Sequence, residues 1–360
     1  MWTNSATRFE PRDLAEQLAQ RIDALAQQLL PRGTYGQGRR YWRVGSIAGE
    51  PGQSLCVRLD GSKRGRWRDY AAGEGGDALD LVAAVACRGH KGAACRWATE
   101  WLGLGRIDAG EAQRLKSQAE RARELRRRDL GREAERNARD AKKLWLSAAA
   151  LQPGDAGWRY LASRGSDLEQ LPKPPAALRL HPSLWNAESR QYWPALVAAI
   201  CAPDGRQVNV HRVWLQLQDD QVVTKAPLAR PKLSMPGSYA GGCVRLWQGA
   251  SRKPWRDMPE GETLIAGEGI EDVMPIVCAR PEWRACAVLS VSSLASLILP
   301  PQVARVIWIA QNDPHGSPAA LTLERALRVH REAGRRVGVI RPPAYVKDVA
   351  ELAERVAEAA

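Results

Sequence analysis

The stretch VIWIAQNDPHG, residues 306–316, decides the fold class of this chain. It begins as an apolar run with the length of a buried strand, and it turns polar at Gln311. Pro314 and Gly316 are residues that end regular structure, so the predicted strand stops just before them. Asp313 therefore stands at the tip of a strand, with an amide rather than an acid two residues earlier.

The hundred residues around this stretch alternate between strand-like and helix-like segments. Strands are predicted at 263–266, 285–291, 305–311 and 336–342, and helices at 268–280, 292–299, 317–334 and 347–360. Strands alternating with helices of this length predict an α/β fold, in which helices cover both faces of a parallel sheet. In such sheets the chemistry collects at the carboxyl ends of the strands.

Acidic residues follow three of these predicted strands. Glu268 comes directly after the first strand and Asp272 one helical turn later, Asp313 follows the strand of the opening stretch, and Asp348 precedes the last helix. Carboxylates gathered at one edge repel one another, and hard cations such as Mg²⁺ or Mn²⁺ take oxygen ligands. The pattern therefore predicts a divalent metal site, and Gly269 would let backbone approach a ligand closely.

Each acid also has a plainer interpretation. Glu268, Asp272 and Asp348 are placed where exposed acids stabilise the first turn of a helix. Asp313 lies in an Asn-Asp-Pro sequence that is typical of turns. The coincidence of all four at one sheet edge favours the metal site.

Four segments follow from composition and pattern along the chain. We expect an N-terminal unit at 1–105, a charged helical linker at 106–143, a small α+β subdomain at 144–262 and the parallel-sheet domain at 263–360. The linker interleaves both signs of charge at helical spacing with almost no apolar face, which is typical of a solvated helix; its basic excess leaves contact with phosphates open.

The segments before the parallel sheet have element signals of their own. Apolar residues at three- and four-residue spacing predict a helix over 10–30, ended by Pro31. Further predicted elements are strands at 41–47, 54–61, 176–182, 192–202 and 208–218, helices at 143–150 and 157–165, a Gly-rich turn that leads into a helix within 67–86, and a hairpin turn at 203–205.

Charge points to a polyanionic partner. The net charge is +13 and the pI is near 9.7, as in many nucleic-acid-binding proteins. A plainer explanation is a coding bias that enriches Arg, since the chain has 14 Trp and one Phe. The seven cysteines form no C-x-x-C pair, which favours reduced thiols. No apolar run approaches the roughly 20 residues that cross a bilayer, so we expect a cytoplasmic protein without a membrane segment.

Three motifs in the last hundred residues resemble one family. GEGIED (267–272) resembles the E-G-x-x-D signature of the Toprim fold, AQNDPHG (310–316) lies where that fold carries its D-x-D motif, and YVKDVAEL (345–352) is similar to its K-D-x-x-D/E-L element. The order and spacing resemble the primase-like proteins of phages, plasmids and integrative elements, which are related to bacterial primases. The resemblance implies a Rossmann-like Toprim domain at 263–360.

The resemblance extends upstream. Residues 143–165 are similar to a helix pair of these mobile-element primases, and 192–247 to the strand-rich half that precedes their Toprim domain. Residues 40–103 resemble the N-terminal unit, which is a zinc ribbon in replicative primases. Asp69 and Ala72 stand at two would-be ligand positions, which implies a degenerate ribbon that does not bind zinc.

The aromatic and basic residues left in that unit have two interpretations. They form either a surface on which single-stranded DNA stacks or a small core. These residues are Trp42, Arg66, Trp67, Arg68 and Tyr70.

By resemblance, the chain would join nucleoside triphosphates into short RNA primers on single-stranded DNA. The resemblance makes Glu268 a metal ligand or general base, with Asp272, Asp313 and Asp348 as further acids of the metal site. The basic residues that would neutralise the triphosphate or the template backbone are Lys225, Lys232, Arg212 and Arg245, with Trp67 and Arg68 contacting DNA from the N-terminal unit.

Gln311 departs from the family pattern, because it stands at the first acidic position of the expected D-x-D motif. A neutral amide is a poorer Mg²⁺ ligand than a carboxylate. Three functions therefore stay open: a primase of a mobile element, a catalytically impaired accessory protein that binds DNA, and a metal-dependent nuclease. The sequence has no G-x-x-x-x-G-K-[ST] motif, so a helicase would act as a separate protein.

Overall fold

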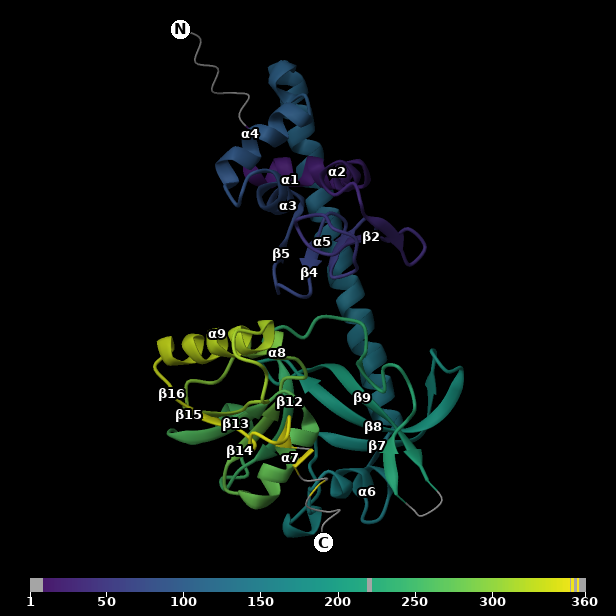
Figure 1. Cartoon of the computed structure of the whole chain (residues 1–360), viewed down its shortest axis with the longest axis vertical. Helices are drawn as coiled ribbons and strands as arrows, with labels where there is room; N and C mark the ends of the chain where they lie inside the picture. Colours follow the sequence, from purple (N-terminus) through teal and green to yellow (C-terminus); the bar gives the residue numbers. More distant parts are fainter. Residues whose placement is uncertain (1–8, 219–221, 350, 353–354, 356–360) are drawn as a thin grey trace. The chain divides into compact units, whose positions relative to one another are not determined.

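The structure is a computed structural model that describes residues 9–218, 222–349, 351–352 and 355. The contacts divide the chain into two units, Met1–Glu133 and Ala134–Ala360, each with hydrophobic clusters of its own. Figure 1 shows the elements of both units along the chain. Among the described residues, none of the helices combines the length and the hydropathy needed to span a bilayer.

The first unit is an antiparallel sheet with four helices and the beginning of a fifth. Its elements are α1 (Pro11–Gln20), α2 (Ile22–Leu29), β1 (Thr34–Gly36), β2 (Tyr41–Val44), β3 (Leu55–Arg58), β4 (Trp67–Asp69), β5 (Gly75–Gly76), α3 (Ala78–Ala86), α4 (Lys91–Trp101) and the start of α5 (Ala109–Ser147). The five strands pair in chain order, each antiparallel to the next.

The amphipathic pattern over 10–30 is confirmed as two helices rather than one. Leu14, Leu18, Ile22 and Leu25 are at most 1% exposed and belong to the core of this unit. The helix is interrupted at Arg21, which separates α1 from α2. The break between the two helices keeps the apolar side chains of both facing the core, as the amphipathic pattern predicts.

The Gly-rich turn into a helix is also confirmed. Asp77 is the N-cap of α3, and its side chain accepts hydrogen bonds from the backbone N–H groups of Leu79 and Asp80. The Asp80 carboxylate in turn accepts from the Asp77 N–H, which completes a capping box. This reciprocal pair fixes the point at which the chain passes from strand β5 into helix α3.

The predicted charged linker is a single helix, α5, but only part of its surface is solvated. Arg123 pairs with Asp13 at 2.7 Å, and Arg126 makes two hydrogen bonds to Glu16 at 2.8 and 2.9 Å. Both acids are buried and lie on α1. The first half of α5 therefore packs onto its unit through ion pairs, which a search for an apolar face does not detect.

The second unit contains one mixed sheet. Its elements after α5 are β6 (Ala149–Ala150), α6 (Ala156–Ser163), β7 (Leu178–Asn186), β8 (Gln191–Cys201), β9 (Gln207–Leu217), β10 (Val223–Lys225), β11 (Lys232–Ser234), β12 (Cys243–Gln248), β13 (Glu262–Gly267), α7 (Ile270–Ala279), β14 (Arg284–Ala287), α8 (Val291–Leu294), β15 (Val303–Ile309), α9 (Pro318–Glu332) and β16 (Arg336–Ile340). Single helical turns of 3-10 type lie at Leu104–Arg106, Leu168–Gln170 and Trp255–Asp257.

The sheet has eleven strands, which come from both the predicted α+β subdomain at 144–262 and the predicted parallel-sheet domain at 263–360. The order is β10-β9-β8-β12-β14-β13-β15-β16, with β11 beside β9, β7 beside β8 and β6 beside β7. Strand β12 lies between β8 and β14, so the sheet continues from the antiparallel half into the parallel half. The small α+β subdomain and the C-terminal domain thus share one sheet.

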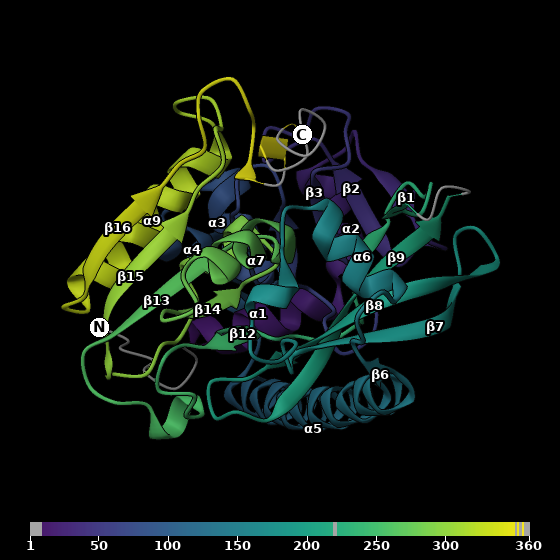
Figure 2. The same ribbon diagram turned by 90° about the horizontal axis from the view of Figure 1, so that it is seen from below.

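The parallel half is the predicted α/β arrangement. Strands β14, β13, β15 and β16 are parallel neighbours. Ile265 on β13 packs in a core that includes α7, whereas its neighbours Leu264 and Ala266 pack in a core that includes α8 and α9. Helices therefore cover both faces, and Figure 2 shows α9 alongside β15 and β16. The closing helix predicted at 347–360 falls largely outside the described residues.

Candidate active site

The carboxyl ends of three neighbouring parallel strands, β13, β15 and β16, lie level with one another. Gly267 at the end of β13 is paired with Ile309 on β15, and Ile309 is paired with Ile340 on β16. Glu268 follows the first of these ends directly, and the loops that carry Asp313 and Asp348 follow the other two. We call the edge that carries these three acids the acidic edge.

Asn312 ties two loops of the acidic edge together. Its backbone N–H donates to the carbonyl of Lys347 at 2.8 Å. Its side-chain Nδ2 lies within hydrogen-bond distance of three carbonyls, those of Pro342 at 3.2 Å, Pro343 at 2.9 Å and Val346 at 2.8 Å. Asp313 and Asp348 are chain neighbours of the bonded residues Asn312 and Lys347, so these contacts hold their two loops side by side.

Asp348 lies half-buried at the start of a helix, and its side chain caps the first turn. Its Oδ1 accepts a hydrogen bond from the backbone N–H of Glu351 at 2.8 Å. The carboxylate of Glu351 accepts from the Lys347 N–H at 2.7 Å, so the two acids cap this helix start together. The cap sets the direction of the Asp348 carboxylate without involving its Oδ2 in that bond.

The first turn of α7 is tightly packed. Asp272 is buried, with 6% of its surface exposed, so it is not the exposed first-turn acid of the plainer interpretation. A Cβ at Gly269, the N-cap of α7, would lie 2.8 Å from Oδ2 of Asp272. A side chain at this position would displace the Asp272 carboxylate, and the approach of a ligand to Gly269 stays a prediction.

Gln311 lies half-buried where β15 passes into its loop. Its backbone carbonyl accepts a hydrogen bond from Nη1 of Arg341 at 3.1 Å, which joins the same two loops once more. The backbone at this position is thus set by Arg341, and the side chain decides only whether a second carboxylate stands beside Asp313.

A buried carboxylate that sequence reasoning did not single out lies on the same helix. Glu271 is 4% exposed, and three side chains converge on its Oε1: the Tyr160 hydroxyl donates at 2.8 Å, Lys232 Nζ lies at 3.4 Å and Lys225 Nζ at 3.8 Å. We call these four residues the lysine cluster. The sequence signal was a second acid beside Asp272 in a helix that is otherwise apolar.

Electrostatics in the lysine cluster keep Glu271 ionised. Burial by itself would raise its pKa, but the ammonium groups of Lys232 and Lys225 and the hydrogen bond from Tyr160 outweigh burial and lower the pKa to about 2. Burial lowers the pKa of Lys225, while the charges of Glu271 and Asp348 oppose that shift. Glu271 lies in the first turn of α7, whose N-cap Gly269 directly follows Glu268, so the cluster adjoins the acidic edge.

His211 lies on β9 beside the cluster. Burial lowers its pKa to about 4, against the charge of Glu271 and together with the charges of Lys232 and Arg212. Its Nδ1 lies 3.0 Å from the Ser234 hydroxyl on β11. The imidazole is therefore neutral at pH 7 and supports the strand that carries Lys232.

The two predicted arginines are engaged elsewhere in the second unit. Arg212 donates to the carbonyls of Leu233 and Ser234 and stacks over Trp214 at 4.8 Å, so it joins β9 to β11. Arg245 donates to the carbonyls of Ala202 and Pro203 and stacks over Trp255 at 4.6 Å. Their described contacts are structural and are made with backbone and indole groups.

The DNA-stacking prediction for Trp67 in the first unit is wrong for its side chain. Trp42 and Trp67 are only 7% and 6% exposed and belong to the core, so the alternative interpretation holds for both. Arg66 and Arg68 are exposed, and Tyr70 is 70% exposed. A stacking surface in this unit would rest on Tyr70 with those two arginines.

Comparisons with known proteins give a partial match. A family model described as Domain of unknown function (DUF7146) matches residues 135–246. No curated protein matches the chain. The solved structures that are similar to it include bacterial and phage primases.

Three of these structures show the extent of the similarity. The zinc-binding and RNA polymerase domains of the Aquifex aeolicus primase are 14% identical, over 98% of this chain and 85% of that one, with a TM-score of 0.34. The primase fragment of the bacteriophage T7 primase-helicase is 15% identical over 59% and 76%, with a TM-score of 0.35. A DnaG primase catalytic domain bound to single-stranded DNA is 21% identical over 58% and 74%, with a TM-score of 0.36.

The similarity is distant but spans much of the chain.

The acidic edge fits a divalent cation by the chemistry of its donors. Carboxylate oxygens are the ligands that Mg²⁺ and Mn²⁺ prefer. Within the described ranges, no group of three or more His, Cys, Asp or Glu side chains is arranged to hold a metal ion. Because Mg²⁺ commonly uses one or two carboxylates with water and substrate phosphates, the edge fits a metal shared with a phosphate better than a site closed by protein ligands.

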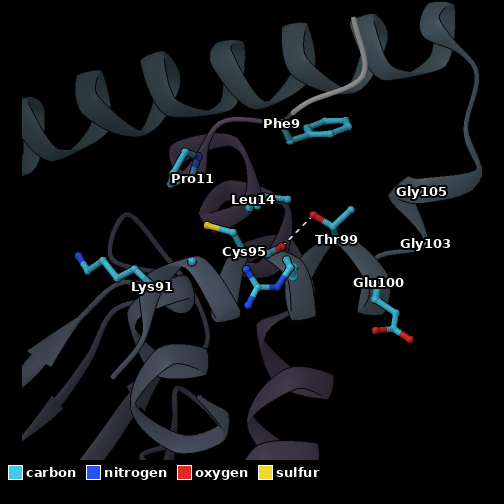
Figure 3. Close-up of a pocket in the computed structure, with 11 residues that line it drawn as sticks. Phe9, Pro11, Leu14, Lys91, Cys95, Thr99, Glu100, Gly103 and Gly105 are labelled. Carbon is cyan, nitrogen blue, oxygen red and sulfur yellow. Dashed lines mark hydrogen bonds between the residues drawn. The ribbon is translucent and has the colours of Figure 1, made fainter. Parts of the chain in front are cut away.

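A cavity of about 1040 Å³ lies in the first unit. Figure 3 shows Phe9 and Leu14 at its apolar side, with Lys91 and Glu100 on α4 around it. The Thr99 hydroxyl donates to the Cys95 carbonyl at 2.8 Å, a contact within α4. The cavity combines apolar surface with charges of both signs, and no set of converging polar groups marks a reaction there.

Proposed function

We propose that the second unit is a nucleotidyltransferase of the primase type, which joins nucleoside triphosphates into short RNA primers on single-stranded DNA. One observation carries the proposal: level strand ends bring the loops of Glu268, Asp313 and Asp348 together beside a pair of lysines. Acids beside ammonium groups can handle a metal-bound polyphosphate, because one set binds the cation and the other the anion.

The residues divide the chemistry between them. In the proposed reaction, Lys225 and Lys232 bind the triphosphate and Asp313 and Asp348 would hold Mg²⁺, while Glu268 would be a further ligand or the general base. When bound, the metal offsets the negative charge on the phosphoryl oxygens. As general base, the carboxylate of Glu268 takes the proton of the attacking hydroxyl, whose oxygen bonds to the α-phosphorus as the bond to the pyrophosphate leaving group breaks. Asp272, which shares the first turn of α7 with Glu271, is a further acid of the site.

Two further parts of the proposal concern partners. The net charge of +13 favours a polyanionic template such as single-stranded DNA. A replicative helicase is a further proposed partner. We propose a cytoplasmic role in the replication of a phage, plasmid or other mobile element.

Gln311 favours a second candidate. With an amide at this position the edge has one carboxylate fewer than the related motif, and the protein would then bind DNA as an accessory factor with little catalysis of its own. Both candidate functions use the lysine cluster, but only the primase would synthesise RNA.

The test is to identify the product. The full chain is incubated with labelled nucleoside triphosphates and single-stranded DNA, with Mg²⁺ or Mn²⁺. Short labelled RNA chains that require both template and metal support the primase; DNA binding without synthesis supports the accessory protein. Degradation of the DNA without synthesis would show a nuclease, and no binding to DNA would refute the nucleic-acid function itself.

A further inference from the structure

Glu271 joins four elements of the second unit through one oxygen atom. The carboxylate comes from α7, the hydroxyl of Tyr160 from α6, and the ammonium groups of Lys225 and Lys232 from β10 and β11. All three contacts are made by Oε1. A single buried atom thus fixes where two flexible side chains end.

Glu271 and the two lysines differ in how far they are exposed. Glu271 is 4% exposed, whereas the side chains of Lys225 and Lys232 are 28% and 41% exposed. The carboxylate is therefore buried more deeply than the two lysine side chains that contact it. A lysine ammonium has three donors, so contact with Glu271 leaves donors for a second anion.

The neighbouring groups hold this arrangement in place. Arg164 lies over the Tyr160 ring at 5.6 Å, on the side of the cluster formed by α6. His211 and Ser234, bonded at 3.0 Å, support β11 next to Lys232. The charge of Asp348 acts on Lys225 from the acidic edge.

Two ammonium groups held close together repel each other, and long lysine side chains lose entropy when they are ordered. One buried carboxylate beneath them offsets the repulsion and leaves the cluster with a net charge of about +1. An incoming polyphosphate then meets two donors that are already oriented, so less entropy is lost on binding.

We propose that Glu271, held by Tyr160, is a positioning residue that sets Lys225 and Lys232 as a paired ammonium site for the polyphosphate of a nucleoside triphosphate. The inference rests on the proposed function and names how its substrate is bound. Glu271 acts through the lysines and does not itself touch the ligand.

Simple Coulomb reasoning predicts the opposite effect of removing this acid. Glu271→Gln takes away a negative charge beneath two cations, which by charge alone would strengthen binding of an anion. If the carboxylate positions the lysines, the same substitution weakens binding, because the ammonium groups separate. The sign of the change distinguishes the two accounts.

The experiment measures ATP and inorganic triphosphate binding to the full chain by calorimetry. The variants are Glu271→Gln, Tyr160→Phe and the pair Lys225→Met/Lys232→Met, with Glu324→Gln on α9 as an exposed control of the same charge change. We expect Glu271→Gln to weaken binding about tenfold, Tyr160→Phe about threefold and Glu324→Gln less than twofold. In the Lys225→Met/Lys232→Met background, Glu271→Gln should change binding less than twofold, because its effect passes through the lysines.

Each outcome bears on the proposal. Unchanged or tighter binding in Glu271→Gln, an equal loss in the lysine-free background, or no binding by the natural chain would overturn it. If Glu271→Gln does not fold, as judged by circular dichroism, Tyr160→Phe carries the test, since it keeps the carboxylate. If triphosphate binding follows the prediction but no primers form, the inference stands and the proposed function fails.

Discussion

Gln311 is the residue at which the acidic edge departs from the related motif. Its backbone is already held by Arg341, so a change of side chain alters the charge beside Asp313 without moving the loop. We expect Gln311→Asp to lower the Mg²⁺ concentration needed for primer synthesis and to raise its rate, because a carboxylate replaces a neutral amide as a possible ligand.

The control for that substitution is Gln302→Asp. Gln302 lies just before β15, at the end of the strand opposite to Gln311. Gln302→Asp therefore adds the same charge away from the acidic edge. Equal activity of Gln311→Asp and the natural chain would show that the amide does not limit the site.

His211 makes stability depend on pH. Its pKa in the folded protein is about 4, below the ordinary value of 6.5, so the unfolded chain takes up a proton that the folded chain does not. Stability is therefore full above pH 6.5 and falls as the pH drops from 6.5 to 4, by up to about 3 kcal/mol. Urea unfolding at pH 7.5 and 5 should show a smaller loss for His211→Gln than for the natural chain.

The exposed His315 provides the control for the pH effect. His315→Gln should lose as much stability between these pH values as the natural chain does. The comparison stays above pH 4.5 because Glu271, with a folded pKa of about 2, loses its own contribution as the pH falls below its ordinary value of 4.5. An identical pH dependence in His211→Gln would contradict the burial argument.

At the scale of elements, Asn312 is the contact on which the geometry of the acidic edge rests. Its amide lies against three carbonyls of the loop after β16. Asn312→Ala leaves those carbonyls without this donor and should cost about 1–3 kcal/mol locally. We expect faster amide hydrogen exchange in peptides that cover 341–349, and lower metal-dependent activity.

Ser296→Ala, in a loop of the same unit, is a suitable comparison for Asn312→Ala. Its hydroxyl donates to the carbonyl of Ser293 within its own turn, so exchange at 341–349 should not change. Unchanged exchange in Asn312→Ala as well would show that the two loops are held by other contacts.

The packing of α5 against α1 depends on charge as well as on apolar contacts, which include Ala112 and Leu115. Arg126→Met leaves the carboxylate of Glu16, which is 3% exposed, buried without its main partner. We expect a loss of about 3–5 kcal/mol, which is typical when one partner of a buried ion pair is removed. Hydrogen exchange of α1 in the full chain measures this loss.

The exposed pair Arg128–Glu124 is the matched control for Arg126. Both side chains are largely solvent-exposed, and removal of such a pair costs less than about 1 kcal/mol. Adding Glu16→Gln to Arg126→Met should recover part of the loss. If Arg126→Met behaves like Arg128→Met, the ion pair does not hold α5 in place.

At the scale of the whole molecule, the sequence predicted the features that depend on residues close together in the chain. The alternation over 263–342 was sufficient for the order of strands and helices, because period and turn residues are read within a few positions. It also placed Glu268 and Asp313 after neighbouring strands of a parallel sheet.

Contacts between distant residues were not predictable in the same way. The bond from Tyr160 to Glu271 joins residues 111 positions apart, and the pair of Arg126 with Glu16 spans 110. No spacing rule connects such partners, since only the packed fold brings them together. For the same reason the sequence could not decide whether Trp67 faces solvent or the core.

The central claim is that the acidic edge beside the lysine cluster catalyses nucleotide transfer. The most direct measurement compares the natural chain, Glu268→Gln and Glu324→Gln for the rate at which labelled nucleoside triphosphates enter RNA on single-stranded DNA with Mg²⁺. Our account predicts synthesis by the natural chain and by Glu324→Gln, and a loss of roughly 100-fold or more in Glu268→Gln. Synthesis by Glu268→Gln at the rate of the natural chain, or no synthesis by the natural chain, would contradict it.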